Sequence, residues 1–249
     1  MQWQTNQLAW HESDIHHAIR TYGNQWIPNL LPEDEPVCSA DAAATKQQPA
    51  PPQQNRRARV LIPLCGKSLD LAHLVRQSHA VSQVVGVEGI PKAIHEFSQE
   101  HPDLNLRQLK ESSLSSSSKF IQYVGTNIVI LNGDLFELDE TVTNGRFDAI
   151  FDRGSLVAIQ PTLRDQYITI MGRLIAPAGR ILLSVFERRS GTDEDRTGPP
   201  FSVSEADVHQ LYGTQSWVES ITLLDDNGEP NRTTGTTMKG RYFLIQAKE

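Results

Sequence analysis

The sequence has few cysteines, a deficit of positive charge and no long hydrophobic run, and these absences exclude several classes of protein. Its 249 residues include 23 lysines and arginines against 30 acidic residues, a formal net charge of -7. It therefore lacks the basic surface expected of a protein that binds nucleic acid phosphates. No stretch approaches the roughly 20 apolar residues that cross a bilayer. We expect no nucleic-acid or membrane partner, and a small-molecule ligand instead.

The N-terminal residues and the two cysteines bear on cellular location. The opening residues MQWQTNQLAWHESD have neither the basic start nor the apolar core of a signal peptide. Cys38 lies in a segment rich in Pro, Ala and Gln, whereas Cys65 ends a predicted strand. These two residues could form a disulfide, but a reduced pair is favoured. Both observations predict a cytoplasmic protein.

Two segments have no apolar periodicity and are predicted to be insertions. Residues 32–55 are rich in Pro, Ala and Gln, and residues 110–119 are rich in Ser. Such compositions bury too little apolar surface to offset the entropy of ordering them. We therefore interpret residues 1–249 as one domain with two insertions that carry no chemistry.

The rest of the chain alternates between patterns typical of buried strands and of helices. Strands are predicted at residues 60–64, 84–88, 128–131, 147–151 and 181–186. Helices are predicted at residues 69–76, 91–99, 163–174 and 204–212. This alternation predicts an α/β fold in which helices cover both faces of a mostly parallel sheet.

Two further patterns predict antiparallel pairs. The sequence KFIQYVGTNIVIL is typical of a hairpin that turns at Gly125, Thr126 and Asn127. Near the C-terminus, the apolar runs WVESITLL and RYFLIQA are separated only by a loop. We expect the second pair to form an antiparallel edge of the sheet.

The segment VLIPLCGKSLDL joins the first predicted strand to the first of these helices through a turn at residues 65–68. Ligands of open α/β sheets bind beyond the carboxyl ends of the strands. Gly66 would allow close approach to the backbone, and Ser68 can cap a helix whose N-terminus favours an anion. The segment is neither a G-x-G-x-x-G fingerprint nor a P-loop, because Leu61 stands where the first P-loop glycine would be.

Polar residues also follow the next strands. Glu88 follows Gly66 at about the 20-residue spacing at which an acidic side chain binds ribose hydroxyls. Asp134 comes after the hairpin, and Asp152 and Arg153 come after the next strand. Together these residues predict a nucleotide site. The alternatives remain open: an ordinary turn at Gly66, a solvated strand end at Glu88, a helix cap at Asp134 and a surface ion pair at Arg153.

The motifs VLIPLCGKSLDL, VVGVEG, NGDLFEL, FDRGSLVAIQP, RDQY and GPPFSV, in this order, resemble the thiopurine S-methyltransferase family. Its members are class I methyltransferases that use S-adenosyl-L-methionine. The resemblance runs from about Trp3 to Tyr212. It implies a Rossmann-like α/β fold with a seven-stranded, mostly parallel sheet, an antiparallel last strand and helices on both faces.

The resemblance also implies which residues bind the cofactor. Leu64 and Gly66 would contact its methionine part, and Glu88 its ribose hydroxyls. Its adenine would lie on Asp134 and Leu135.

Further residues would border the acceptor. The resemblance places Arg153 between the cofactor and the acceptor. Residues 1–31 would form an N-terminal lid, with Trp3 on the cofactor and Trp10 near the substrate. The GPPF motif at residues 198–201 would stiffen a wall of the acceptor pocket, or merely end the loop before the next helix.

No metal is expected at the histidines of the N-terminal region. His11, His16 and His17 lack other ligands at a suitable spacing, and we expect them on a solvated helix or lid.

The resemblance implies methyl transfer to a small sulfur nucleophile such as a thiopurine, with selenium or tellurium compounds and halides as related acceptors. Arg153 could raise the ionised fraction of a thiol. Asp152 is a candidate proton acceptor, or the partner that orients Arg153.

Two other functions remain as alternatives. The first is a protein of the same fold that binds the cofactor without methyl transfer. The second is a nicotinamide-dependent oxidoreductase, which the lack of G-x-G-x-x-G disfavours. No exposed heptad repeat demands a partner chain, and we expect a monomer.

Overall fold

The computed structural model describes residues 14–28, 30, 57–109, 119–188, 198–225 and 238–249. Trp3, Trp10 and the rest of the first 13 residues of the predicted lid lie outside these ranges. So do Cys38 with the predicted insertion at 32–55, and residues 110–118 of the second one. The interpretations given for these residues stay predictions.

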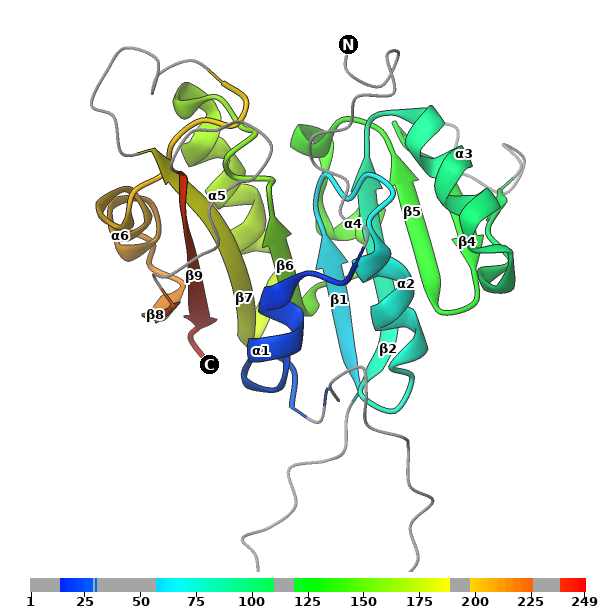
Figure 1. Ribbon diagram of the computed structural model, residues 1–249, viewed down its shortest axis with the longest axis horizontal. Helices are drawn as coiled ribbons and strands as arrows, with labels where there is room; N and C mark the ends of the chain where they lie inside the picture. Colours follow the sequence, from blue (N-terminus) through cyan, green and yellow to red (C-terminus); the bar gives the residue numbers. More distant parts are fainter. Residues whose placement is uncertain (1–13, 29, 31–56, 110–118, 189–197, 226–237) are drawn as a thin grey trace, which may run out of the picture.

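The strands of the described residues form one nine-stranded sheet with the order β3-β4-β5-β2-β1-β6-β7-β9-β8 (Figure 1). Their bounds are β1 (Ala58–Ile62), β2 (Val81–Glu88), β3 (Arg107–Gln108), β4 (Ile121–Gly125), β5 (Ile128–Asn132), β6 (Phe147–Arg153), β7 (Ile175–Arg188), β8 (Val218–Asp225) and β9 (Met238–Ala247). The central strands β5, β2, β1, β6 and β7 are parallel to one another. The predicted mostly parallel sheet is therefore confirmed.

Both predicted antiparallel pairs are confirmed. β8 and β9 form the antiparallel edge, with the last strand, β9, between β7 and the outer strand β8. At the other end, the short turn after Gly125 makes β4 pair with β5, and β3 pairs with β4. Those two strands extend the expected seven-stranded sheet to nine.

Helices cover both faces of the sheet (Figure 1). They are α1 (His17–Trp26), α2 (Leu69–Arg76), α3 (Pro91–Glu100), α4 (Glu140–Thr143), α5 (Arg164–Leu174) and α6 (Glu205–Gly213), with short 3-10 turns η2 (Pro102–Leu104), η4 (Leu135–Glu137) and η5 (Pro161–Leu163). The four helices predicted from the sequence are confirmed to within one residue at each end. No helix in the described ranges is both long and apolar enough to span a bilayer.

Local signals explain where these helices begin. Ser68 caps α2, because its side chain accepts a hydrogen bond from the Asp70 backbone N–H. Pro91 occupies the first turn of α3. Ser204 and Asp207 form a reciprocal capping box at the start of α6.

Residues of β6 alternate between two hydrophobic clusters, one on each face of the sheet. After a register shift between Phe147 and Ala149, Ile150 belongs to the cluster that includes α5 and α6 residues, whereas Ala149 and Phe151 belong to the cluster that includes α1, α2 and α3 residues. Because successive side chains of a strand point to opposite faces, the last two residues of β6, Asp152 and Arg153, also separate. This alternation decides what each of them can contact.

Helix α1 lies in the predicted lid region, where a solvated helix or lid was expected, and it packs directly on the sheet. Its Trp26 is 1% exposed, and the Trp26 indole N–H donates to the carbonyl of Arg180 at 3.1 Å. His16 precedes the helix, where its Nδ1 accepts a hydrogen bond from the Ala18 N–H at 3.2 Å. Its ring lies 5.7 Å from the Phe151 ring. The expectation that His16 lies on a solvated helix is therefore wrong, because its side chain packs into the core.

The buried His16 predicts an acid-sensitive fold. Burial and the nearby charge of Arg153 lower the pKa of His16 from 6.5 to about 3, so the folded protein binds this proton less readily than the unfolded chain does. The stability that His16 contributes is complete above about pH 6.5 and is lost as the pH falls toward 3. We expect the wild-type protein to lose about 2 kcal/mol more than His16→Asn between about pH 7.5 and pH 5, measured by urea unfolding.

Asparagine keeps an acceptor for the helix cap but does not titrate. His17→Asn, at an exposed neighbouring position, serves as the control and should behave as the wild type. Equal losses in the wild type and His16→Asn would contradict the prediction.

Candidate functional site

The turn after β1 is held against the end of β2. Both Leu64, with φ 44°, and Gly66, with φ 55°, adopt the left-handed region, which is uncommon for a leucine. The Cys65 N–H donates to the carbonyl of Val87 at 2.9 Å. The Gly66 N–H donates to Glu88 Oε2 at 2.8 Å. These contacts end β1 at Ile62, two residues earlier than predicted, and fix the backbone of the turn.

Glu88 is the buried carboxylate at the centre of this arrangement, with 7% of its surface exposed. Its second oxygen, Oε1, accepts a hydrogen bond from the Ile90 N–H at 2.7 Å. Burial raises the pKa of Glu88, and the backbone donors partly oppose that rise. Each carboxylate oxygen can accept more than one hydrogen bond. Glu88 can therefore hold the turn and still accept hydroxyl donors from a ligand.

Lys67 of this turn forms ion pairs with two glutamates of α3. Its Nζ lies 3.0 Å from Glu96 Oε2 and 2.6 Å from Glu100 Oε1, both on α3. The lysine of GKS is thus committed to two carboxylates, in agreement with the sequence argument against a P-loop. These partners were missed from the sequence, although their spacing of four residues on one helix could have indicated a shared face.

Asp134 and Leu135 lie where β5 passes into η4. The exposed Asp134 begins η4, and its Oδ1 accepts a hydrogen bond from the Phe136 N–H at 2.9 Å. The helix-cap alternative for Asp134 is therefore confirmed. Leu135 is 3% exposed and packs in the core. Both residues lie beside the end of β2, because Asn132 Nδ2 donates to the carbonyl of Glu88 at 2.8 Å.

The half-buried Arg153 ends β6 on the face that α1 and α2 cover. Burial lowers the pKa of His16, and the charge of Arg153 lowers it further. Burial raises the pKa of Asp70, and the charge of Arg153 is one of the influences that oppose this rise. Asp70 is 2% exposed. Its Oδ1 accepts a hydrogen bond from the His16 N–H at 2.9 Å, and Ser68 Oγ donates to its Oδ2 at 2.8 Å. Sequence reasoning missed Asp70, which ties the start of α1 to the cap of α2.

Asp152 lies on the opposite face from Arg153 and is fully buried. The Tyr167 hydroxyl donates to its Oδ2 at 2.7 Å, and the Leu156 N–H donates to its Oδ1 at 3.1 Å. Burial raises the pKa of Asp152 to about 6. These hydrogen bonds point to α5 and its connecting turn, so the structure does not bring Asp152 to Arg153 as an orienting partner.

A side-chain hydrogen bond joins the turn after β6 to the turn after β1. Ser155 is fully buried, and its Oγ donates to the carbonyl of Pro63 at 2.7 Å. Asp152 accepts hydrogen bonds from Ser155 and Leu156. The Asp152 network therefore supports the backbone on which Leu64 and Gly66 lie.

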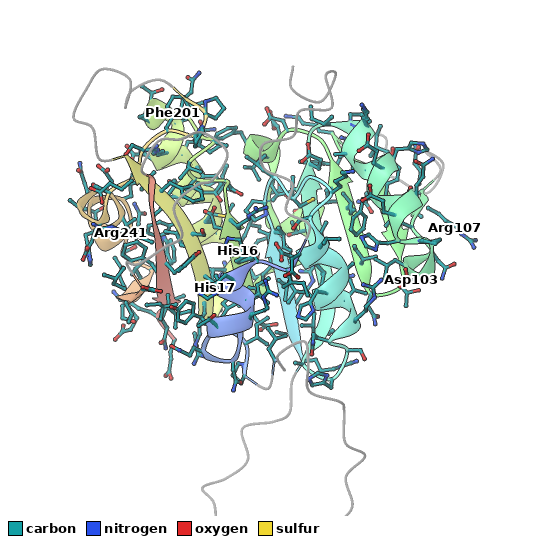
Figure 2. The ribbon with its side chains drawn as sticks, viewed as in Figure 1. His16, His17, Asp103, Arg107, Phe201 and Arg241 are labelled. Carbon is teal, nitrogen blue, oxygen red and sulfur yellow. The ribbon has the colours of Figure 1, made fainter. Side chains whose placement is uncertain are left out.

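The GPPF segment passes the carboxyl ends of β6 and β7, where Figure 2 labels Phe201. The Phe201 N–H donates to the carbonyl of Val157 at 2.7 Å, and the Val203 N–H donates to that of Phe186 at 2.8 Å. These bonds join the segment to the turn after β6 and to β7. The predicted site residues that the structure describes thus lie along one edge of the sheet, the edge at which ligands of open α/β sheets bind.

The chain matches the family model for thiopurine S-methyltransferase over residues 44–245. It is 38% identical over 169 residues to a thiopurine S-methyltransferase of Xanthomonas campestris pv. campestris (strain 8004), covering 68% of this chain and 71% of that protein. It is 31% identical over 227 residues to that of Pseudomonas fluorescens (strain Pf0-1), covering 91% of this chain and 86% of the relative.

Its fold is similar to the crystal structure of a 1,6-didemethyltoxoflavin-N1-methyltransferase of Burkholderia thailandensis with bound S-adenosylhomocysteine. The TM-score is 0.50 at 20% identity, over 78% of this chain and 72% of that one. The Rossmann-like class I methyltransferase fold is therefore confirmed.

The raised pKa of Asp152 predicts how its removal changes stability with pH. The folded protein binds this proton more readily than the unfolded chain, so the contribution of Asp152 to stability falls as the pH rises from about 4 to about 6, and is constant above that. Relative to the wild type, Asp152→Asn should gain about 1 kcal/mol between about pH 5 and pH 7.5, measured by urea unfolding. Asp165→Asn, at an exposed aspartate of α5, is the control. A difference that stays constant with pH would contradict the prediction.

Proposed function

The chain belongs to the thiopurine S-methyltransferase family and is an S-adenosyl-L-methionine-dependent methyltransferase, and on that premise we propose that its acceptor is a small sulfur nucleophile. A thiopurine or another small thiol fits this role, with selenium or tellurium compounds and halides as related soft acceptors. Membership of a methyltransferase family leaves no support for the nicotinamide-dependent alternative.

The observation that carries the cofactor part of the proposal is the position of Glu88. Two backbone N–H groups hold its carboxylate between the turn after β1 and the start of α3, and its remaining lone pairs would accept the ribose hydroxyls. Leu64 and Gly66 would then lie along the methionine part, near the N-terminus of α2, which favours the methionine carboxylate. Asp134 and Leu135 would border the adenine.

S-adenosyl-L-methionine supplies an activated methyl group on a sulfonium, so the protein chiefly has to orient the acceptor and exclude water. The cofactor residues cover the ends of β1, β2 and β5, which leaves the ends of β6 and β7 for the acceptor. Arg153 ends β6 there. A thiol has a free pKa of about 8.5, and a nearby cation raises the thiolate fraction at neutral pH.

Asp152 has a supporting role in this proposal. It is fully buried on the face opposite Arg153 and hydrogen bonded to Tyr167 and Leu156. It would hold the turn after β6, and through Ser155 the turn after β1, and would not take a proton from the acceptor directly.

Residues outside the described ranges enter the proposal through the family alone. Trp3 would cover the cofactor and Trp10 would approach the acceptor, both from a lid within residues 1–31 of a single-domain protein. Cys65 is a free, buried thiol, which fits the reducing conditions of the cytoplasm. We propose a monomeric cytoplasmic enzyme.

The cofactor site is tested by thermal unfolding with S-adenosylhomocysteine. A ligand at 100 times its dissociation constant adds about 2.7 kcal/mol, which for a chain of this size is about 5–10 °C. We expect this rise in the wild type and none with NAD. Glu88→Gln should abolish it, because the amide would place a donor against either the Gly66 or the Ile90 N–H and lose an acceptor for the ribose. Glu140→Gln, near the amino end of β6, should keep the full shift.

The acceptor site is tested by kinetics of Arg153→Met with a thiol acceptor. At about pH 7 we expect kcat to fall about 10-fold, since a neighbouring cation lowers a thiol pKa by about one unit or more. The dissociation constant of S-adenosylhomocysteine should change less than about 2-fold, and the loss in kcat should shrink toward pH 9, where the free thiol ionises unaided. A loss that is independent of pH, or an equal loss of cofactor affinity, would assign Arg153 a structural role.

A further inference from the structure

Arg241 of β9 lies between two carboxylates that come from different elements. Its Nη2 lies 2.8 Å from Glu187 Oε2 on β7, and its Nη1 pairs with Glu205 Oε2, the first residue of α6. Only 14% of the Arg241 side chain is exposed. Figure 2 shows Arg241 beside α6, at the side of the sheet away from α3. One side chain thus joins β7, β9 and α6.

Strand alternation sets the face on which this ion pair forms. Tyr242 belongs to the hydrophobic cluster of α1, whereas Phe243 belongs to that of α5 and α6. Arg241 lies on the same face of the sheet as Phe243, and α6, which carries Glu205, covers that face. Because the guanidinium is largely buried, solvent screens its attraction to the carboxylates less than at an open surface.

The ion pair with Glu205 fixes the end of the segment at residues 198–204, which begins with the GPPF motif. This segment leads directly into α6, and its backbone is hydrogen bonded to the turn after β6 through Phe201 and to β7 through Val203. A second arginine, Arg164 of α5, donates from Nη2 to the carbonyl of Ser202 at 3.3 Å. The segment is therefore held by backbone bonds in its middle, and by arginine side chains from α5 and β9 toward its end.

This segment passes the carboxyl ends of β6 and β7, the part of the sheet edge that the proposed cofactor residues leave open. A displacement of the start of α6 would move the segment relative to Arg153. We infer that Arg241 is a positioning residue that sets the specificity for the acceptor by fixing residues 198–204 as one wall of the acceptor site. This inference rests on the proposed function.

The test measures kinetics of Arg241→Met with 6-mercaptopurine and thiophenol, a bicyclic and a monocyclic thiol. We expect kcat/KM for 6-mercaptopurine to fall about 10-fold, mainly through KM, because small misplacements near a reacting group have effects of this size or larger. The loss for the smaller thiophenol should be less. The dissociation constant of S-adenosylhomocysteine, whose proposed contacts come from β1, β2 and β5, should stay within about 2-fold of the wild type.

Three further variants and one control separate positioning from folding. Arg241→Lys keeps the positive charge, and its KM for 6-mercaptopurine should lie between those of the wild type and Arg241→Met. Glu205→Gln removes only the contact with α6, from a more exposed partner, and should shift KM in the same direction even if Arg241→Met folds poorly. In Arg241→Met/Glu205→Gln the two changes should be non-additive, since they remove the same contact. Arg146→Met, which breaks the pair with Glu140 just before β6, is the matched control and should leave KM unchanged.

The outcomes distinguish this inference from the proposed function. If the wild-type protein methylates neither thiol, the proposed acceptor class fails, and the inference fails with it. If the wild type is active but Arg241→Met and Glu205→Gln leave KM for both thiols within about 2-fold, only the inference is overturned. An equal loss of cofactor affinity, or no rescue by lysine, would also overturn it, because Arg241 would then support the fold as a whole.

Discussion

The site depends on one buried carboxylate that bonds to the backbone on both sides of it. Burying Glu88 is unfavourable unless its oxygens find donors, and the N–H groups of Gly66 and Ile90 supply them. The same two bonds fix the turn after β1 against the start of α3. The cost of burial and the geometry of the turn are therefore linked, because a turn that moved away would leave Glu88 Oε2 without its Gly66 donor. Leu64 keeps its strained φ in this setting, as residues at functional sites often do.

The second constraint is the alternation of β6, which separates neighbouring charged residues into different environments. Arg153 reaches the face of His16 and Asp70, where a cation can act on a ligand at the sheet edge. Asp152 faces Tyr167 in the core and supports the turns that carry the site. Asp152 and Arg153 of the DRG motif thus lie in different environments. Arg153 lies at the end of the sheet where the ligand would bind, and Asp152 lies in the core beneath it. A strand end makes this division possible, because one residue step rotates the side chain to the other face.

Much of the fold followed from local signals in the sequence, and the failures share a cause. The starts of α2 and α3 were predictable because Ser68 and Pro91 act on the first turn of the helix that follows them. The spacing from Gly66 to Glu88 predicted a ribose-binding carboxylate, but not the hydrogen bond between the Gly66 N–H and that carboxylate. The packing of helix α1 was missed because its apolar face, with Ala18, Ile19 and Trp26, is short and lies among polar residues, and only packing on the sheet makes the helix stable. The contacts of Asp70 and Arg241 could not be predicted from local sequence, because their partners His16 and Glu205 lie 54 and 36 residues away.

The two glutamates that pair with Lys67 bear on which form of the cofactor, reactant or product, the proposed site would favour. S-adenosyl-L-methionine carries one positive charge more than S-adenosylhomocysteine, because the sulfonium becomes a neutral thioether. An unpaired ammonium in the turn after β1 would repel the reactant but not the product, and so would favour product inhibition. Lys67 is instead paired with Glu96 and Glu100 of α3. If the cofactor binds at this turn as proposed, these ion pairs would lower that penalty and make the exchange of spent cofactor for fresh cofactor more favourable.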